Sequence, residues 1–125
     1  FYFFDVGVVN SLAGNVDRGR SFEHFIFHEM RSYISYEDKQ VDLKFWRSQT
    51  HQEVDFVIDE RLAIEVKTSQ RISDSDLKGL KALSQEIKFE RQMVVCFEKQ
   101  WRKVKDIEIV PYQQFLQELW SGELI

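Results

Sequence analysis

The stretch Gln52–Gln70, QEVDFVIDERLAIEVKTSQ, decides how the rest of this chain is interpreted. Two runs rich in β-branched and aromatic residues flank the polar triplet Asp59-Glu60-Arg61, a pattern that predicts an antiparallel hairpin. If this triplet is the loop, Ile58 pairs with Leu62, and the register of both strands is fixed. A loop of three residues is therefore our first expectation.

This register brings charged side chains together. Asp55 then lies directly opposite Glu65, and Lys67 shares the face of Glu65, because side chains alternate along a strand. Facing residues of an antiparallel pair have Cβ atoms roughly 5 Å apart, so two carboxylates there can hold one hard cation. Charges among residues that favour burial must be paired or bind a metal. The alternative is a salt bridge to Lys67 on a half-exposed sheet surface.

Composition predicts one domain covering residues 1–125. The chain has 125 residues, of which 43% are hydrophobic and 14% aromatic, enough for a single core. It begins with Phe1-Tyr2-Phe3-Phe4 and has no initiating Met, so we expect a fragment of a longer protein.

Charge and cysteine content narrow the possible environments and partners. The net charge of −4 and the pI near 5.4 argue against binding to nucleic acid by bulk electrostatics, although a local basic surface remains possible. The single Cys96 lies in an apolar run, which predicts a buried reduced thiol and fits a cytoplasmic protein. No apolar run approaches the roughly 20 residues of a membrane span, so we expect no membrane partner.

The periodicity predicts a helix, three strands, a helix and a strand, in the order αβββαβ. Such an order indicates an α/β fold in which helices flank a central mixed β-sheet. An acid, Glu23, lies at the edge of the apolar stripe of the first of these helices. The expected elements are a strand at 1–4, a short helix at 6–12 capped by Asp5, a helix from Ser21 to Tyr36, a strand from Leu43 to Gln49, the hairpin, a helix from Ser73 to Ile87, strands at Arg91–Glu98 and Ile107–Val110, and a closing helix from Pro111.

The segments GRSFEHFIFHEMR, FWRSQ, EVDFVI and AIEVKTS together carry a resemblance. An acid on the first helix, an Asp in the second strand and Glu-x-Lys in the third resemble the PD-(D/E)XK phosphodiesterase superfamily, which has the restriction-endonuclease-like fold. More narrowly, the chain resembles the domain of unknown function found C-terminal to AAA+-type ATPase modules in many prokaryotic proteins. The resemblance covers nearly the whole chain.

The resemblance implies a metal-dependent nuclease acting on nucleic acid, with DNA as the expected form. It implies Glu23, Asp55 and Glu65 as ligands of Mg²⁺ or Mn²⁺, with Asp55, Glu65 and Lys67 as the catalytic group. It also implies an ATPase domain upstream in the same chain as a partner. The alternative is a nuclease-fold module that no longer cuts and binds nucleic acid or a protein for that ATPase. The oligomeric state is left open.

Two departures limit this expectation. The exonuclease branch of the superfamily has a Gln and a Tyr on the helix after the lysine, whereas LKGLKALSQEI offers Gln85 without the Tyr. The chain has no Gly-x-x-x-x-Gly-Lys-Ser/Thr, so it contains no ATP site of that type.

Basic and aromatic residues elsewhere are weaker candidates for substrate contact. Arg47 or its neighbour Trp46 could meet a nucleotide, but alternation lets only one face the site, and core packing is the better interpretation of Trp46. Arg102 and Lys103, beside Trp101, belong to the most basic stretch, Lys99–Lys105, for which a solvated turn is the favoured interpretation.

Other acids and the histidines give further alternatives. His24 and His28 have the spacing of a two-histidine zinc site but lack the Glu of His-Glu-x-x-His, so satisfied or surface histidines are favoured. Glu53 could replace Asp55 as a ligand, and Glu29 could replace Glu23, although each is less well placed.

Overall fold

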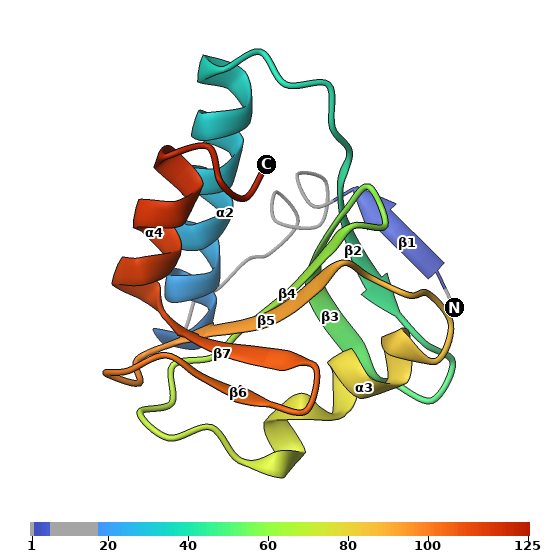
Figure 1. Ribbon diagram of the computed structural model, residues 1–125. Coiled ribbons are helices and arrows are strands. Elements are labelled where there is room, and N and C mark those ends of the chain that lie inside the picture. Colours follow the sequence, from blue (N-terminus) through green and yellow to red (C-terminus); the bar gives the residue numbers. More distant parts are fainter. Residues whose placement is uncertain (1, 6–17) are drawn as a thin grey trace.

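A computed structural model describes residues 2–5 and 18–125. Within them the chain forms one mixed sheet of seven strands in the order β1-β2-β3-β4-β5-β7-β6 (Figure 1). The central strands β4, β5 and β7 are parallel, and the remaining neighbours pair antiparallel. The strands are β1 (Tyr2–Asp5), β2 (Leu43–Arg47), β3 (Glu53–Ile58), β4 (Leu62–Val66), β5 (Arg91–Cys96), β6 (Arg102–Val104) and β7 (Ile107–Pro111).

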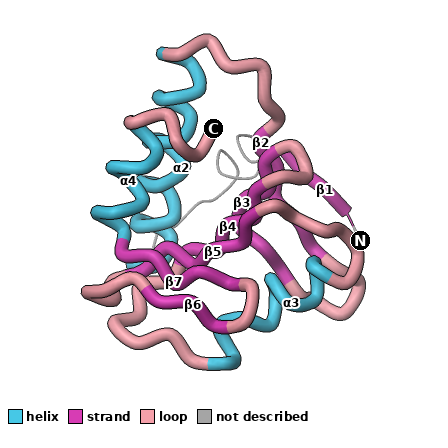
Figure 2. The backbone as a smooth tube through the Cα atoms, viewed as in Figure 1, coloured by secondary structure: helices cyan, strands magenta, loops and turns pink. Residues whose placement is uncertain are grey.

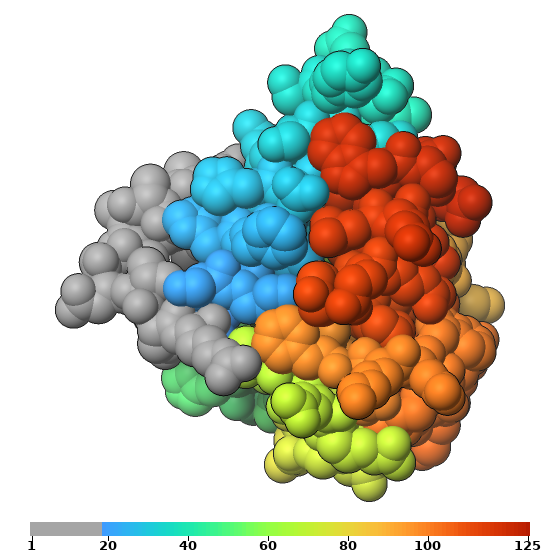
Figure 3. Space-filling model, turned by 90° about the vertical axis from the view of Figure 1, so that its left-hand side faces the viewer, coloured from blue at the N-terminus to red at the C-terminus, as the bar shows by residue number. Residues whose placement is uncertain are grey.

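Helices cover both faces of this sheet, so the expected α/β class with a mixed sheet is confirmed. On one face α2 (Arg18–Tyr36) lies beside α4 (Tyr112–Trp120), and their side chains form one continuous surface (Figure 3). On the other face a 3-10 turn, η1 (Asp74–Leu77), leads directly into α3 (Lys78–Ser84) (Figure 2). The observed succession α2, β2, β3, β4, α3, β5 matches the expected order αβββαβ.

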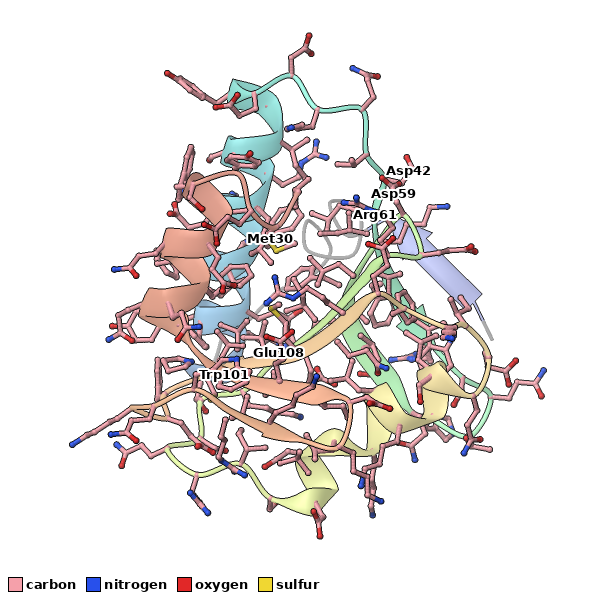
Figure 4. All side chains as sticks on the ribbon, viewed as in Figure 1. Met30, Asp42, Asp59, Arg61, Trp101 and Glu108 are labelled. Atoms are coloured by element: carbon pink, nitrogen blue, oxygen red, sulfur yellow. The ribbon has the colours of Figure 1, made fainter. Side chains whose placement is uncertain are left out.

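Each face has its own apolar core. Met30 of α2 points towards the sheet (Figure 4) and packs with Phe56, Ile64 and Phe115 in the first core. Leu80 of α3 belongs to the second core, with side chains from the opposite face of the same strands. Because β4 is buried on both faces, every one of its residues from Leu62 to Val66 is shielded from solvent.

The hairpin register confirms our expectation. Ile58 pairs with Leu62, which leaves residues 59–61 as the loop. The Arg61 amide donates to the Ile58 carbonyl at 2.9 Å, while Asp59 and Glu60 have φ of 51° and 56°. Two successive positive φ angles are typical of a type I′ turn, whose twist suits a hairpin. The Asp42 amide donates to Asp59 Oδ1 at 3.1 Å, which ties the loop to the start of β2 (Figure 4).

Several expected boundaries were wrong. Helix α2 begins at Arg18 and not at Ser21, because Gly19 and Arg20 accept helical geometry and serine need not be the cap. The expected helix Ser73–Ile87 is divided into η1 and α3 and ends at Ser84. Its predicted start is confirmed, since Ser73 is the N-cap and forms a capping box with Asp76.

The strand ends also differ from expectation. Strand β2 stops at Arg47 and not at Gln49, and β5 stops at Cys96 and not at Glu98. The basic stretch contains a short edge strand, β6, because Arg102–Val104 can pair with β7. The helix expected at 6–12 lies outside the described residues. Among the residues that are described, no helix has both the length and the apolar character needed to cross a membrane.

Candidate functional site

A pocket of about 470 Å³ lies at the end of β4, between the first turns of α2 and the η1–α3 segment. Helices from opposite faces of the sheet reach it, because it is located where the central strand stops. Charged side chains of both signs line it: Arg20 and Glu23 of α2, Asp55 of β3, Glu65 of β4, Lys67 after β4 and Lys78 of α3. The four residues expected to form the catalytic and metal site are all among them.

Asp55 and Glu65 are brought together by the hairpin register. The paired ladder of β3 and β4 runs from Ile58↔Leu62 to Phe56↔Ile64, and its next step would place Asp55 opposite Glu65. The Asp55 carboxylate accepts a hydrogen bond from the Val66 amide at 2.8 Å, so a side chain replaces the backbone partner there. This contact fixes Asp55 over the end of β4. The two carboxyl groups also share a hydrogen bond.

The environment of Glu65 disfavours its charged form. Glu65 is only 6% exposed, and burial is the main reason that its pKa lies well above the usual value. The negative charge of Asp55 and the shared hydrogen bond raise this pKa further, and Lys67 opposes them. A protonated Glu65 carboxyl can donate to Asp55, which accounts for two acids in contact.

Glu23 belongs to the same electrostatic group. Partial burial, and then the charge of Asp55, raise the pKa of Glu23 to about 7, while Arg20 and Lys67 act in the opposite direction. Three acids from three elements therefore compete for a limited amount of positive charge. Such a cluster is relieved by protonation or by a bound cation.

Gly79 allows α3 to approach this cluster closely. A Cβ at this position would lie 1.9 Å from the Glu53 carbonyl oxygen and 3.2 Å from Glu65 Oε2. Only a residue without a side chain fits, so Gly79 sets the distance between α3 and the acidic end of the pocket. The only feature of the sequence that pointed to this contact is the glycine itself, which lies inside a predicted helix.

Lys67 is positioned by the neighbouring strand. Its amide donates to the Val95 carbonyl of β5 at 3.0 Å, immediately after β4 ends. The side chain is half-buried and lines the pocket with Glu65, as alternation predicts. Lys67 thus belongs to a main-chain segment held on the parallel part of the sheet.

The basic residues expected to contact substrate lie elsewhere. Arg47 is exposed and binds the Glu53 carboxylate, with Nε at 2.9 Å. Arg102 makes a two-pronged ion pair with the buried Glu98. Lys103 is exposed on β6. The structure brings none of these three to the lining of the acidic pocket.

The aromatic alternatives are also accounted for. Trp46 is 1% exposed, so its expected place in the core is confirmed. Trp101 remains partly exposed and donates from Nε1 to Glu108 at 3.1 Å (Figure 4).

The alternative ligands do not assemble into a second centre. The rings of His24 and His28 lie 4.6 Å apart on α2, and Glu29 accepts a hydrogen bond from Trp120. Glu53 lines the acidic pocket but is paired with Arg47. Within residues 2–5 and 18–125, no three His, Cys, Asp or Glu side chains are arranged to hold one metal ion as they are placed.

Sequence reasoning missed two basic residues of the pocket. The predicted helix begins at Ser21 and leaves Arg20 out, whereas helix α2 includes it. Lys78 lies within the helix predicted from Ser73 to Ile87, but the sequence does not show that the start of α3 meets the end of β4. Both residues lie where α2, α3 and the end of β4 meet. Tertiary packing determines this meeting point, so local sequence patterns do not show it.

Comparison with known proteins gives one result. No curated protein and no solved structure matches the chain. A family model does match, over residues 18–115, and its family is described as a domain of unknown function, DUF4143. This match includes Glu23, Asp55, Glu65 and Lys67 and spans most of the chain. The chain therefore belongs to the DUF4143 family.

Proposed function

We propose that this domain hydrolyses phosphodiester bonds of nucleic acid, with DNA as the expected substrate, in a divalent-metal-dependent reaction. The observation that supports this proposal is the convergence of Asp55, Glu65 and Lys67, with Glu23, in one pocket at the end of β4. The order of elements and the acid-acid-lysine pattern also support a restriction-endonuclease-like fold, which we include in the proposal.

The donor set fits a hard divalent ion. Mg²⁺ prefers oxygen ligands, keeps several waters, and is usually bound by one or two carboxylates together with substrate phosphates. Asp55 and Glu65 supply such a pair, and Glu23 lies on the same pocket wall, where it can reach the ion directly or through water. A bound Mg²⁺ or Mn²⁺ would stabilise charge on the phosphoryl oxygens and lower the pKa of a bound water.

The roles of the residues follow from their positions. Asp55, held by the Val66 amide, and the buried Glu65 form the ligand pair. Lys67 projects into the same pocket, where its ammonium can orient the attacking water or stabilise charge on the scissile phosphate. Arg20 and Lys78 line the pocket and add positive charge for a phosphate group.

A cleavage assay tests this function. Plasmid, linear, branched and single-stranded nucleic acids are incubated with the protein in Mg²⁺ or Mn²⁺, beside Asp55→Asn and Lys67→Ala. We expect each variant to cut at least about 100-fold more slowly, the lower range for loss of a positioned acid–base group. Asp42→Asn and Lys99→Ala make the same chemical changes at exposed positions away from the pocket and should cut normally. The absence of divalent-dependent cleavage, or equal cleavage by all four variants, refutes the proposal.

A non-catalytic role is the second candidate. It is favoured by the shared hydrogen bond between Asp55 and Glu65, which links the two acids without an ion. In this case the domain would bind nucleic acid or a protein partner for an ATPase in the same chain. Calorimetry with Mn²⁺ separates the two candidates. The nuclease must bind Mn²⁺, and Asp55→Asn must weaken this binding, whereas the non-catalytic module requires no Mn²⁺ binding.

A further inference from the structure

A second pocket, of about 580 Å³, lies at the other end of α3, and lysines make up four of its eleven lining residues. It is bounded by the end of α3, the segment that leads to β5, and the turn between β6 and β7. Its basic residues are Lys81, Lys88, Lys103 and Lys105. Two acids, Glu90 and Asp106, also line it, so four positive charges face two negative ones in a chain whose net charge is −4.

The lysines of this pocket have no ion-pair partners among the described residues. The salt bridges between described residues are those of Arg47 with Glu53, Arg91 with Glu108 and Glu118, and Arg102 with Glu98. These arginines thus neutralise acids of the protein, whereas none of the ion pairs between described residues involves a lysine of this pocket. Unpaired ammonium groups gathered around one hollow are suited to bind an anion.

Gln92 adds a polar strand residue to the lining of this pocket. This β5 residue lines the pocket and is 8% exposed, and its side-chain Oε1 is buried without a hydrogen-bond partner in the described part of the chain. Buried amides are normally satisfied, so such a group calls for an explanation. The orphaned Oε1 is an acceptor and does not itself bind an anion, whereas the N–H groups of the same amide are donors that can.

One helix connects the lysine pocket to the acidic pocket. Lys78 lines the acidic pocket, while Lys81 and Gln85 line the lysine pocket. Spacings of three and four residues place these side chains on one stripe of α3. At 1.5 Å per residue the stripe is about 10 Å long, which equals the rise along the helix axis of about three nucleotides of one duplex strand, at 3.4 Å each.

We infer that the lysine pocket binds backbone phosphates of a nucleic acid strand that runs along α3 from the acidic pocket. This inference rests on the proposed function, since it extends the footprint of the substrate beyond the bond that is cut. It explains how a chain with a net charge of −4 can hold a polyanion, because the required positive charge is local.

Binding without cleavage tests the inference. Fluorescence anisotropy with labelled single-stranded and duplex DNA, in EDTA and at several salt concentrations, compares the protein with the triple variant Lys81→Gln, Lys88→Gln, Lys103→Gln. Each lost phosphate contact reduces the slope of log K against log[salt] by about 0.9. We therefore expect a slope smaller by about 2 to 3 and affinity at least about tenfold weaker. The matched control, Lys39→Gln, Lys44→Gln, Lys99→Gln, removes the same charge from exposed positions outside the pocket and should bind normally.

The result can be separated from the fate of the nuclease proposal. If no protein cuts DNA but the lysine triple variant binds more weakly than its control, the lysine pocket stands and the nuclease proposal fails. Equal slopes for the two triple variants overturn the inference whether or not cleavage occurs. This outcome would also leave the pocket to another anion, such as an acidic protein segment.

Discussion

Glu65 and Gly79 define the candidate site at the scale of single residues. Glu65 is a buried acid next to another acid, and α3 lies against its carboxylate because Gly79 has no side chain. A buried acid is costly unless it is protonated or paired. The stability of the fold at Glu65 therefore depends on the protonation state and the partners of its carboxyl group. The close approach at Gly79 keeps α3 packed against the Glu65 carboxylate.

Gly79→Ala tests the role of this contact. In a solvent-exposed helix interior, this change stabilises by up to about 1 kcal/mol. Here the new Cβ would meet the Glu53 carbonyl oxygen at 1.9 Å, so α3 must shift away from β3. We expect the free energy of unfolding to fall by about 1 to 3 kcal/mol, the usual cost of overpacking.

Urea denaturation measures this change, and metal-dependent cleavage by the folded variant should fall as well. Ser84→Ala, an exposed position on the same helix, is the control and should leave stability nearly unchanged. A Gly79→Ala protein as stable as the parent would show that α3 accommodates the methyl group without moving.

The hairpin of β3 and β4 is the element on which the site depends. Its turn places Asp59 and Glu60 at positive φ, a region that favours Gly and tolerates Asp better than Glu. Glu60→Gly creates the Asp-Gly pair preferred in type I′ turns. We therefore expect Tm to rise by a few degrees, which corresponds to about 0.5 to 1 kcal/mol.

Thermal unfolding followed by circular dichroism is sufficient for this measurement. Glu60→Ala removes the same charge but keeps a Cβ at positive φ, so it should not raise Tm. If both variants stabilise equally, the gain comes from charge and the backbone argument is wrong.

The hairpin could be predicted because its information is local. Loop length sets the register, and the next step of the observed register would place Asp55 opposite Glu65. The amphipathic helices were also found from their spacing, although the start of α2 was missed by three residues. By contrast, β6 is a short edge strand that exists through its pairing with β7, and no pattern in Lys99–Lys105 encodes that pairing.

The same distinction holds for the site. Asp55 and Glu65 lie in one hairpin, and Lys67 follows it directly. The alternation of side chains along a strand was therefore enough to group the three residues. Arg102 was expected at a substrate, but it binds Glu98, and this contact depends on where β6 meets the end of β5. Gly79 and Lys78 reach the pocket through the packing of α3 across the sheet, which periodicity alone does not specify.

At the scale of the whole molecule, Glu98 joins three separate segments. Its carboxylate accepts hydrogen bonds from the Ile72 amide at 2.7 Å and from Arg102 at 2.9 Å, and Arg102 also donates to the Ile72 carbonyl at 3.0 Å. The segment before η1, the end of β5 and the edge strand β6 are thereby held together. The carboxylate must be ionised to do this fully.

This junction makes stability depend on pH in a defined direction. Hydrogen bonds from Arg102, and also from the Ile72 amide, hold the pKa of Glu98 below its usual value of 4.5. A group whose pKa is lower in the folded state stabilises the fold above its unfolded pKa, and this contribution disappears as pH falls through the folded value. The stabilisation by Glu98 should therefore be complete at neutral pH and fade below about pH 4.5.

Glu98→Gln measures this contribution by difference. At pH 7 we expect the variant to be about 2 kcal/mol less stable in urea denaturation, the range for hydrogen bonds to charged groups. The difference should shrink as pH falls below about 4.5, because the parent carboxylate is then protonated and resembles the amide. Acids common to both proteins, including Glu108, cancel in the subtraction. Glu37→Gln, at an exposed position, should show little difference at either pH. A Glu98→Gln deficit that stays constant down to pH 3 would mean that shape and packing, and not the charge of Glu98, hold the three segments together.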